Sequence, residues 1–293
     1  MNYYNEIKNE LINNEINRKV KNYSINRSDL NTYYNVGKML SEAGKHYGEG
    51  IIKEYSKRLT SELGRGYTQS RLRYFRRFYC VFSKCPTMSD KISFSHYCEI
   101  IWFDDSKMKY YLWLACNQNL SVRELRTRIK NKEYERLDDN IKIKVTSKED
   151  INITDYVKNP ILIKNKYNNE NISEKILQQL ILEDISAFLK ELGDGFTFID
   201  NEYKIKIGDR YNYIDLLLYN IKYNCYVVIE LKITELKKEH IGQIEVYMNY
   251  IDNNLKTNIQ DKTIGIIICK KENKYIIEYA SDKRILTRRY MIF

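Results

Sequence analysis

Apolar residues recur at helical spacing along roughly the first 135 residues of the chain. Ser28 can cap a helix that runs toward Ala43, and the glycines that follow interrupt the pattern. The same reasoning predicts a helix over 51–63 and another over 69–82, which Thr68 can cap. A short turn with two glycines joins these two helices, so the pair resembles a helix-turn-helix.

The predicted helix over 69–82 has an apolar face and a basic face. Its apolar stripe consists of Leu72, Phe75, Phe78, Tyr79 and Phe82. Arg73, Arg76 and Arg77 fall within about 100° of one another on the other side, at 100° per residue. Guanidinium groups suit phosphate oxygens, so this side could lie along a nucleic-acid backbone. The ordinary alternative is a solvated basic surface.

A later helix is expected to open at Ser121, where Glu124 completes a capping box. Its apolar side chains face inward, and Arg123 and Arg126 lie on another side. We predict that these two arginines, together with Arg65 in the glycine-bearing turn, are further nucleic-acid contacts. An ordinary amphipathic helix is the alternative here as well.

Histidine and cysteine positions give no metal-binding pattern. The three histidines lack the H-E-x-x-H spacing, and the six cysteines contain no C-x-x-C pair. We therefore expect neither a zinc site nor a disulfide framework, and we interpret the cysteines as buried thiols. His96 is expected to be a packing residue, and Trp102 and Trp113 are expected to lie in the core.

From about residue 172 the pattern changes to a helix followed mostly by strands. Helices are predicted over 174–191 and 236–255, and strands over 196–207, 213–219, 226–233, 264–269 and 275–279. The interval before them is polar, rich in asparagine, and contains Pro160. We therefore predict a helical basic domain over 1–140, a linker over 141–171 and a mixed α/β domain over 172–293. The expected fold class is α+β overall.

The net charge of +10 is unevenly distributed along the chain. Residues 1–140 contain 25 Lys and Arg against 17 Asp and Glu, whereas residues 141–293 contain 24 against 22. A basic excess confined to one half indicates that this half faces a polyanion such as a nucleic acid. The alternative source of the lysines is the codon bias of an AT-rich genome, which the abundance of Asn, Lys, Ile and Tyr would also fit.

Apolar runs in the chain are short. The run over 264–269 is typical and lies far below the roughly 20 residues that span a bilayer. The first residues lack the basic and then apolar pattern of a secretory signal. We therefore expect no membrane association and a cytoplasmic location.

Charged residues interrupt two of the predicted apolar strands. Asp215 lies in one strand, and Glu230 and Lys232 lie in the next. Charges are rarely buried without partners, because removing them from water is costly. Glu230 and Lys232 are two residues apart and point to one face, and the hairpin could bring Asp215 to them. Two carboxylates suit Mg²⁺, and a lysine could act on water or phosphate. The alternative is an ion-pair cluster that serves only the fold, although such clusters stabilise weakly.

At these positions the chain resembles a known superfamily. Asp215 followed by Glu230, Leu231 and Lys232 resembles the D…E-x-K signature of the PD-(D/E)XK nucleases. The predicted helix after them carries Gln243 and Tyr247, similar to the Q-x-x-x-Y motif of the RecB-like branch, and residues i and i+4 share a helix face. The proline in the superfamily's name is replaced by Ile214, a position that varies among its members.

A closer resemblance, to YhcG-like proteins, spans nearly the whole chain. Stretches 191–196, 213–219 and 264–269 resemble the C-terminal nuclease domain of that family, and stretches 47–52, 94–97, 121–125 and 134–137 resemble its N-terminal domain. The resemblance implies a DNA-directed nuclease with a restriction-endonuclease-like C-terminal domain. Genes of the family often lie near restriction-modification or phage-defence systems, which implies partners from those systems.

Position by position, the resemblance implies specific roles. Asp215, Glu230 and the main-chain carbonyl of Leu231 would be metal ligands, with Mg²⁺ as the ion and Mn²⁺ able to replace it. Lys232 would position the attacking water or stabilise charge, and Gln243 and Tyr247 would support phosphate or water. Superfamily members often add an acid from the preceding helix, for which Glu183 is the candidate, with Asp184 adjacent to it.

Two other functions stay open at this point. The chain could be a catalytically inactive nucleic-acid-binding or adaptor protein that keeps a vestigial nuclease fold. A nuclease that cuts RNA instead of DNA would carry the same motifs. Symmetric cutting of two DNA strands would suit a homodimer.

Overall fold

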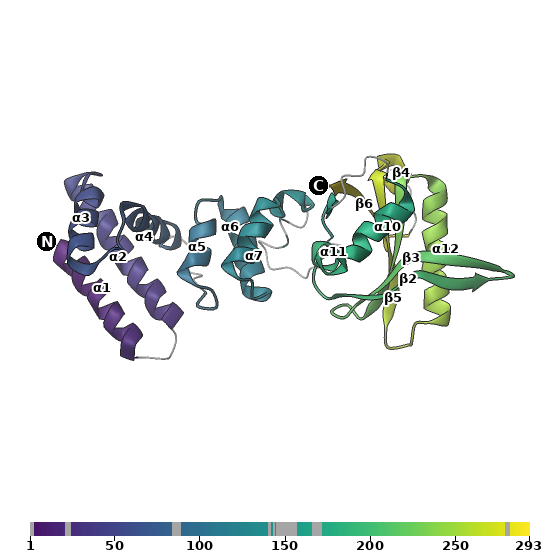
Figure 1. The fold of residues 1–293 in the computed structure, drawn as a ribbon, viewed down its shortest axis with the longest axis horizontal. Helices are drawn as coiled ribbons and strands as arrows, with labels where there is room; N and C mark the ends of the chain where they lie inside the picture. The colour runs from purple at the N-terminus through teal and green to yellow at the C-terminus, as the bar shows by residue number, and fades with distance from the viewer. Residues whose placement is uncertain are drawn as a thin grey trace. The chain divides into compact units, whose positions relative to one another are not determined.

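The computed structural model describes residues 3–20, 25–83, 89–139, 142, 144, 157–165, 172–278 and 282–293 (Figure 1). Contacts between residues divide the chain into two compact units, Met1–Tyr134 and Glu135–Phe293. The first unit is helical and the second is built around a mixed sheet. The α+β fold class predicted from the sequence is therefore confirmed.

The described helices of the first unit follow one another closely along the chain. They are α1 (Tyr3–Val20), α2 (Ile25–Tyr47), α3 (Ile51–Leu63), α4 (Gln69–Phe82), α5 (Phe94–Ile100), α6 (Asp105–Asn117) and α7 (Val122–Lys130). The short 3₁₀ helix η1 (Tyr134–Arg136) follows at the boundary between the units. The helices predicted over 51–63 and 69–82 are confirmed with the same bounds, and Thr68 caps α4 by accepting the N–H of Arg71.

Helix α2 packs closely on α4 around a glycine. A side chain at Gly37 would meet the carbonyl oxygen of Phe75 at 2.1 Å, so only glycine allows this approach. One turn earlier the ring of Tyr33 stacks on that of Phe75, with 4.4 Å between ring centres. The predicted end of this helix before Gly44 is wrong, because α2 continues through Gly44 to Tyr47 and the left-handed turn lies at Gly48.

Two predictions for the α5 region have different outcomes. His96 is buried, and its ring contacts Ser93 and the carbonyl of Leu120, so its packing role is confirmed. Trp102 is not a core residue, because 54% of it is exposed. Its ring instead lies beside Tyr74 and under the guanidinium of Arg77.

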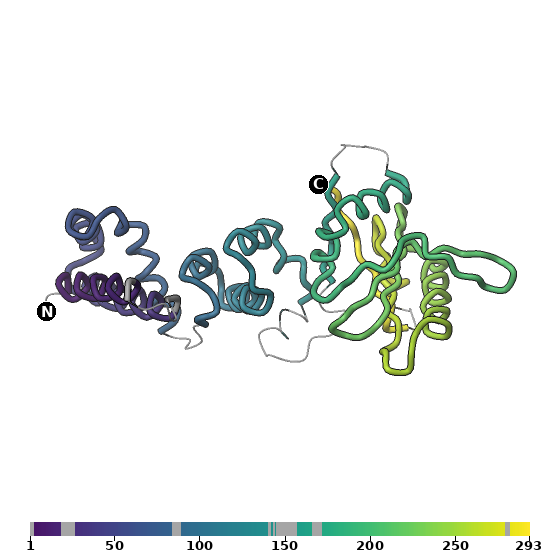
Figure 2. Tube along the Cα trace, turned by 60° about the horizontal axis from the view of Figure 1, so that its bottom comes forward, coloured from purple at the N-terminus to yellow at the C-terminus, as the bar shows by residue number. Residues whose placement is uncertain are grey.

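A six-stranded sheet in the order β1-β6-β5-β4-β3-β2 forms the centre of the second unit (Figures 1 and 2). Its strands are β1 (Ile161–Ile163), β2 (Phe196–Ile207), β3 (Arg210–Asn220), β4 (Cys225–Glu235), β5 (Asp261–Lys271) and β6 (Ile285–Ile292). The pairs β2–β3 and β3–β4 are antiparallel, and the other neighbours are parallel. Parallel pairing of β4 and β5 requires a crossover, which α12 (Lys238–Asn254) provides.

Both faces of the sheet are covered. Leu216, Ile229 and Leu231 pack with apolar side chains of α10 (Glu174–Glu183) and α11 (Ile185–Leu192). Leu217 and Val228 pack on the other face, against α12. Because the middle strands are buried on both faces, they appear in the sequence as nearly continuous apolar runs.

Four elements of the second unit differ from the prediction. The helix over 174–191 is broken at Asp184, whose side chain caps α11 by accepting the N–H of Ala187. The strand predicted over 275–279 is wrong: Lys274–Glu278 is the helix α13, and residue 279 lies outside the described residues. Strand β6 was not predicted. Strand β1 lies inside the interval expected to be a linker, most of which is outside the described residues.

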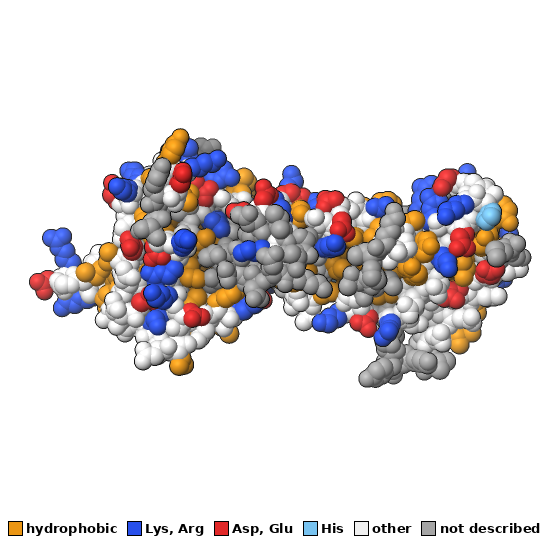
Figure 3. Space-filling model, turned by 180° about the vertical axis from the view of Figure 1, so that it is seen from behind, with side chains coloured by type: hydrophobic (Ala, Val, Ile, Leu, Met, Phe, Trp, Pro, Cys, Tyr) orange, Lys and Arg blue, Asp and Glu red, His pale blue; other side chains and the backbone are white. Residues whose placement is uncertain are grey.

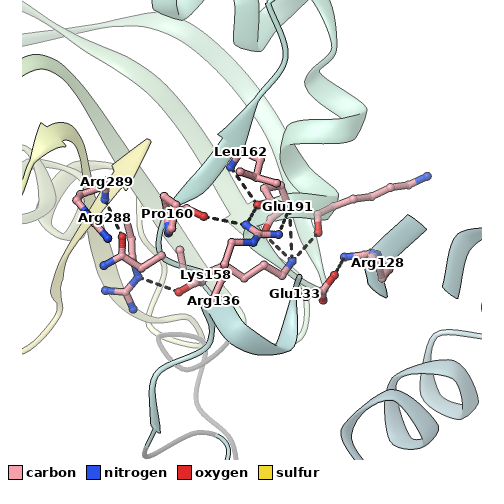
Figure 4. Close-up of polar contacts among 12 residues, drawn as sticks. Arg128, Glu133, Arg136, Lys158, Pro160, Leu162, Glu191, Arg288 and Arg289 are labelled. Carbon is pink, nitrogen blue, oxygen red and sulfur yellow. Dashed lines mark hydrogen bonds and ion pairs between the residues drawn. The ribbon is translucent and has the colours of Figure 1, made fainter. Parts of the chain in front are cut away.

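A buried ion cluster around Glu191 explains why residues near 160 join this unit (Figure 4). The guanidinium of Arg136 pairs with Glu191 and donates a 2.8 Å hydrogen bond to the carbonyl of Pro160. Glu191 accepts further hydrogen bonds. Lys158 Nζ donates to its carbonyl at 2.8 Å, and the N–H of Leu162 donates to its Oε1 at 3.0 Å. These contacts hold β1 against α11.

Candidate active site

The three charged residues that interrupt the apolar strands lie close together in the structure. The antiparallel ladder of β3 and β4 ends with Leu216 opposite Ile229, so the next residues are Asp215 and Glu230. Asp215 extends this pairing with its side chain, because its Oδ2 accepts the N–H of Leu231 at 2.7 Å. The carboxylate of Asp215 therefore lies directly at the end of β4 that carries the other two charges.

Glu230 and Lys232 form an ion pair on one face of β4. The distance from Lys232 Nζ to Glu230 Oε2 is 3.1 Å. Both side chains follow Val228 in the alternation of the strand, and Val228 packs against α12. The convergence of Asp215, Glu230 and Lys232 that the sequence led us to expect is present in the structure.

Burial makes the charge on these acids costly. Glu230 is 1% exposed, and burial, followed by the nearby charge of Asp215, raises its pKa to about 7. Burial likewise raises the pKa of Asp215, although the N–H of Leu231 and the charge of Lys232 oppose this change. Burial disfavours the charge of Lys232, but its carboxylate neighbours, led by Glu230, still raise its pKa above the ordinary value. The lysine therefore remains a cation beside two acids whose charged forms are disfavoured by burial.

One oxygen of this group has no hydrogen-bond partner among the described residues. Glu230 Oε1 is buried and accepts no hydrogen bond from any described residue. An unsatisfied buried carboxylate oxygen is uncommon, because it forfeits its hydration. Two neighbouring carboxylates with raised pKa values and a free oxygen suit a hard divalent cation, which prefers oxygen ligands and keeps several waters. Within the described parts of the chain, no group of three or more His, Cys, Asp or Glu side chains is arranged to hold a metal. The residues present thus fit an ion held by two acids, with main-chain or water oxygens as its other ligands.

Helix α12 brings the predicted Gln243 and Tyr247 together. Gln243 Nε2 donates to the hydroxyl of Tyr247 at 3.1 Å. Tyr247 is buried, which is the largest cause of its raised pKa, and the charges of Glu230, Lys232 and Asp215 also act on it. The hydroxyl of Tyr247 therefore lies within electrostatic reach of all three charged residues.

Helix α10 contributes different residues from the one we predicted. Glu183 is hydrogen-bonded to Gln179, and no contact among the described residues joins it to the charged group. Glu174, nine positions earlier, lies about 13 Å away along the helix axis and half a turn around it. Its Oε2 is 4.0 Å from Lys232 Nζ, and its charge acts on Asp215. Gln178 donates from Nε2 to the carbonyl of Asp215 at 2.9 Å and fixes β3 at this point.

His240 is another neighbour of the group that sequence reasoning missed. It lies in the first turn of α12, and its Nδ1 accepts the N–H of Lys237 at 3.2 Å. Burial lowers its pKa, and so does the nearby charge of Lys232, whereas Glu174 has the opposite effect. The available sequence signal was spacing, since His240, Gln243 and Tyr247 share one helix face.

The six arginines predicted to contact nucleic acid divide into two groups. Three are engaged within the protein: Arg76 pairs with Glu49, Arg77 donates to the carbonyl of Ile101, and Arg126 pairs with Glu99. The others, Arg65, Arg73 and Arg123, are exposed, and no ion pair with a described residue holds them. The second group is the better placed to meet a polyanion.

The described cysteines are free thiols. Cys225 and Cys269 are buried, Cys80, Cys98 and Cys116 are partly buried, and Cys85 lies outside the described residues. Among the helices that the structure describes, none is both long and apolar enough to cross a membrane.

Comparison with solved structures finds matches that cover less than half of the chain. A repair endonuclease from Pyrococcus abyssi matches with 19% identity over 42% of this chain and a TM-score of 0.30. A complex of EndoMS with dsDNA matches with 19% identity over 43% of this chain and a TM-score of 0.32. The matched region spans 48% of each of those chains, so it covers about half of their length.

Sequence comparison covers both units. Residues 154–292 match the model of the YhcG PDDEXK nuclease domain, and residues 7–136 match that of the DUF1016 N-terminal domain. An Escherichia coli (strain K12) protein described as "Putative nuclease YhcG" is 23% identical over 88% of this chain and 80% of its own length. The chain therefore carries a DUF1016 N-terminal domain followed by a YhcG PDDEXK nuclease domain and is homologous to that protein.

Proposed function

We propose that this protein hydrolyses phosphodiester bonds of DNA with the help of Mg²⁺ held by Asp215 and Glu230. The observation that carries the proposal is the buried Oε1 of Glu230, which has no partner in the described part of the chain and lies beside a second carboxylate and a lysine. As a device for stability, such a group is poor, because desolvation of the charges offsets much of their attraction. In a site for a divalent cation and a phosphate, the two carboxylates would bind the cation and the lysine would contact the phosphate.

The protein's own residues have distinct tasks in this proposal. A divalent ion bound there would polarise the scissile phosphate and neutralise charge that develops on it. Asp215 and Glu230 supply the oxygens that hold it, with the main-chain carbonyl of Leu231 as a further ligand. Lys232 keeps its proton and offers a cation to the phosphate or the attacking water. Gln243 orients the hydroxyl of Tyr247 toward the same charges.

Glu174 extends the proposed site from α10. Its carboxylate lies 4.0 Å from Lys232 Nζ, which also pairs with Glu230 at 3.1 Å. It is 46% exposed at its side chain and is thus open to solvent, unlike Glu230. We propose Glu174, in place of Glu183, as the acid that the preceding helix supplies.

The test is a cleavage assay with plasmid, linear, single-stranded and branched DNA, in Mg²⁺ and in EDTA. Lys232→Ala and Asp215→Asn should each lower the rate by roughly 10² or more, because removal of one group that stabilises developing charge typically costs that much. Glu183→Gln is the matched control, as it removes an acid of the same unit outside the group. Wild-type rates in either site variant would refute the assignment.

Two rival functions give different results in the same experiment. A catalytically inactive binding protein would shift DNA in a gel and leave it intact in Mg²⁺. A nuclease directed at RNA would cut an RNA of the same sequence and spare all four DNA substrates. Either outcome would replace the proposed function.

The helical unit is proposed to supply phosphate contacts that do not depend on sequence. Each contact releases counterions from the DNA. A plot of the logarithm of the binding constant against the logarithm of the salt concentration therefore has a negative slope, of about 0.9 per phosphate neutralised. The triple variant Arg65→Ala, Arg73→Ala and Arg123→Ala should therefore reduce this slope by about 3. The control is a triple variant of Arg76, Arg77 and Arg126, which already have protein partners. An unchanged slope in the first variant would exclude this surface.

A further inference from the structure

The hairpin of β2 and β3 extends past the other strands as a projecting arm (Figures 1 and 2). The ladder continues to the tip, where Ile207 lies opposite Arg210. Near its base, one face of the arm is apolar. Ile205 and Ile214 are buried there in the cluster that includes α12, and Tyr203 packs against the same cluster.

The other face of the arm is basic and aromatic. The register places Lys204 opposite Tyr213 and Lys206 opposite Tyr211, so the four side chains alternate with the apolar ones and share this face. We call these four residues the lysine–tyrosine strip. Tyr211 and Tyr213 are 56% and 53% exposed, which is unusual for side chains of this size. Basic and apolar side chains are also visible on the projecting part of the space-filling view (Figure 3).

The strip lies next to the candidate active site along β3. Asp215 follows Tyr213 by two residues, a distance of about 7 Å along the strand. Asn201 pairs with Leu216 and Tyr203 with Ile214, which places Glu202 across from Asp215. A strand of nucleic acid with one phosphate at Asp215 would therefore run outward along Tyr213 and Tyr211.

The spacing of the tyrosines distinguishes between kinds of DNA. Two residues of antiparallel strand span about 6.8 Å. Successive bases of one strand in a duplex are about 3.4 Å apart and are stacked on each other. The faces of paired bases are therefore not available to the two rings, whereas bases of an unpaired strand can separate and stack on aromatic side chains. The lysines can neutralise the phosphates between them, and Lys204 Nζ lies 3.8 Å from the ring centre of Tyr211.

We propose that the lysine–tyrosine strip binds an unpaired DNA strand next to the cleaved bond, so that the protein selects DNA with a single-stranded segment. This inference rests on the proposed function, because it takes the cleaved bond to lie at Asp215 and Glu230. The tyrosines stack on unpaired bases, and the lysines contact phosphates of any DNA. The two kinds of residue therefore make separable contributions to binding.

The experiment measures binding in EDTA, where no cleavage is needed. Fluorescence anisotropy compares a single strand, a fork with a single-stranded arm and a blunt duplex. Tyr211→Ala with Tyr213→Ala should weaken binding of the single strand and the fork at least about fivefold per tyrosine, and leave the duplex within about twofold. Lys204→Ala with Lys206→Ala should weaken binding of all three DNAs and reduce the salt slope by about 2.

Matched controls come from exposed residues of the same unit. Tyr275 is 76% exposed on α13, and Lys262 and Lys283 are exposed, so Tyr275→Ala and the double variant Lys262→Ala with Lys283→Ala remove the same groups elsewhere. Circular dichroism verifies that the arm variants fold. The proposal is overturned if the tyrosine variant binds each DNA as Tyr275→Ala does, or if its affinities for the duplex and the fork fall equally. It is also overturned if the variant changes only the oligomeric state of the protein, measured by sedimentation.

Failure of the strip and failure of the proposed function give different results. If wild-type protein cuts DNA in Mg²⁺ but the tyrosine variant binds every DNA normally, only the strip is refuted. If the wild-type protein cuts no DNA but the tyrosine variant binds single strands more weakly than wild type, the strip still binds unpaired DNA. In that case only the catalytic proposal is refuted.

Discussion

Glu230→Gln should stabilise the metal-free protein at alkaline pH, although it removes a charged group from an ion pair. The substitution keeps the size of the side chain and replaces a buried acid with a neutral amide. In the structure Glu230 is 1% exposed, its Oε1 has no partner among the described residues, and Asp215 is nearby. Glutamine therefore resembles the protonated form of the acid, which the folded state favours.

The magnitude follows from the raised pKa. The pKa of Glu230 moves from 4.5 to about 7 on folding. A tenfold change in proton affinity corresponds to 1.36 kcal/mol, so the folded state loses about 3 kcal/mol when the acid ionises. Because the pKa is raised, the stability associated with Glu230 is fully present below pH 4.5 and is lost as the pH rises through 7. The variant should thus gain up to about 3 kcal/mol above pH 7 and nothing below pH 4.5.

Thermal unfolding in EDTA between pH 4 and pH 9 is the direct measurement. For a protein unit of 150 to 250 residues, 1 kcal/mol shifts the melting temperature by about 2 to 4 °C. The variant should therefore melt about 6 to 12 °C above wild type at pH 8.5, with the two curves meeting in acid. Glu183→Gln is the control, and the difference between its melting temperature and that of wild type should not change with pH in this way. Added Mg²⁺ should raise the wild-type melting temperature more than that of the variant, because a ligand stabilises the state that binds it.

Equal melting temperatures of wild type and Glu230→Gln at pH 8.5 in EDTA would refute this reasoning. That result would mean that the charge of Glu230 is fully compensated in the folded protein, by Lys232 or by water. The unpartnered Oε1 would then have no energetic significance, and the main support for a cation at this position would be lost. A stabilisation that is independent of pH would instead point to packing as its cause.

Three further predictions concern other features of the structure. Glu174→Gln should lower the cleavage rate roughly tenfold, as for residues that support a metal site, while Glu183→Gln should not; equal rates would exclude Glu174. Ser121→Ala breaks a capping box with Glu124 and should reduce the free energy of unfolding in urea by about 1 kcal/mol. Burial raises the pKa of Cys98 to about 12, so maleimide labelling at pH 8, followed by mass spectrometry, should be slow until the protein is unfolded.

The sequence predicted the central strands well because of how they are buried. Strands β2, β3, β4 and β5 appear as apolar or alternating runs bounded by turn residues, and the structure keeps them within a few residues of the predicted bounds. The end of the sheet formed by β6 and β1 was harder to predict. Strand β6 carries Arg288 and Arg289, which mask its alternation, and Arg288 Nε donates to the carbonyl of Val157, 131 positions earlier in the chain. No local pattern contains that contact.

Short apolar runs were assigned incorrectly where tertiary contacts decide the structure. The run at 275–277 has the composition of a strand, yet these residues form α13, since a run of this length is compatible with either state. Helix 174–191 has a continuous helical pattern, but Asp184 adopts a non-helical conformation, with φ −137° and ψ 53°, and caps a second helix. Aspartate at an N-cap could have indicated this break.

The charged site residues that the sequence predicted and the structure brings together lie on strands, whereas Glu174, which was missed, lies on a helix. The two kinds of element differ in what fixes the direction of a side chain. On a strand, successive side chains alternate between faces, so a charge inside an apolar run already reveals its face and its burial. Asp215, Glu230 and Lys232 could therefore be found from the sequence. On a helix, the face that meets the site depends on how the helix packs on the sheet, and an error of nine residues reverses it. That is why Glu183 was chosen and Glu174 was missed. The contribution of a helix to a site of this kind becomes predictable only once one of its contacts to the strands is known, such as that of Gln178 with the carbonyl of Asp215.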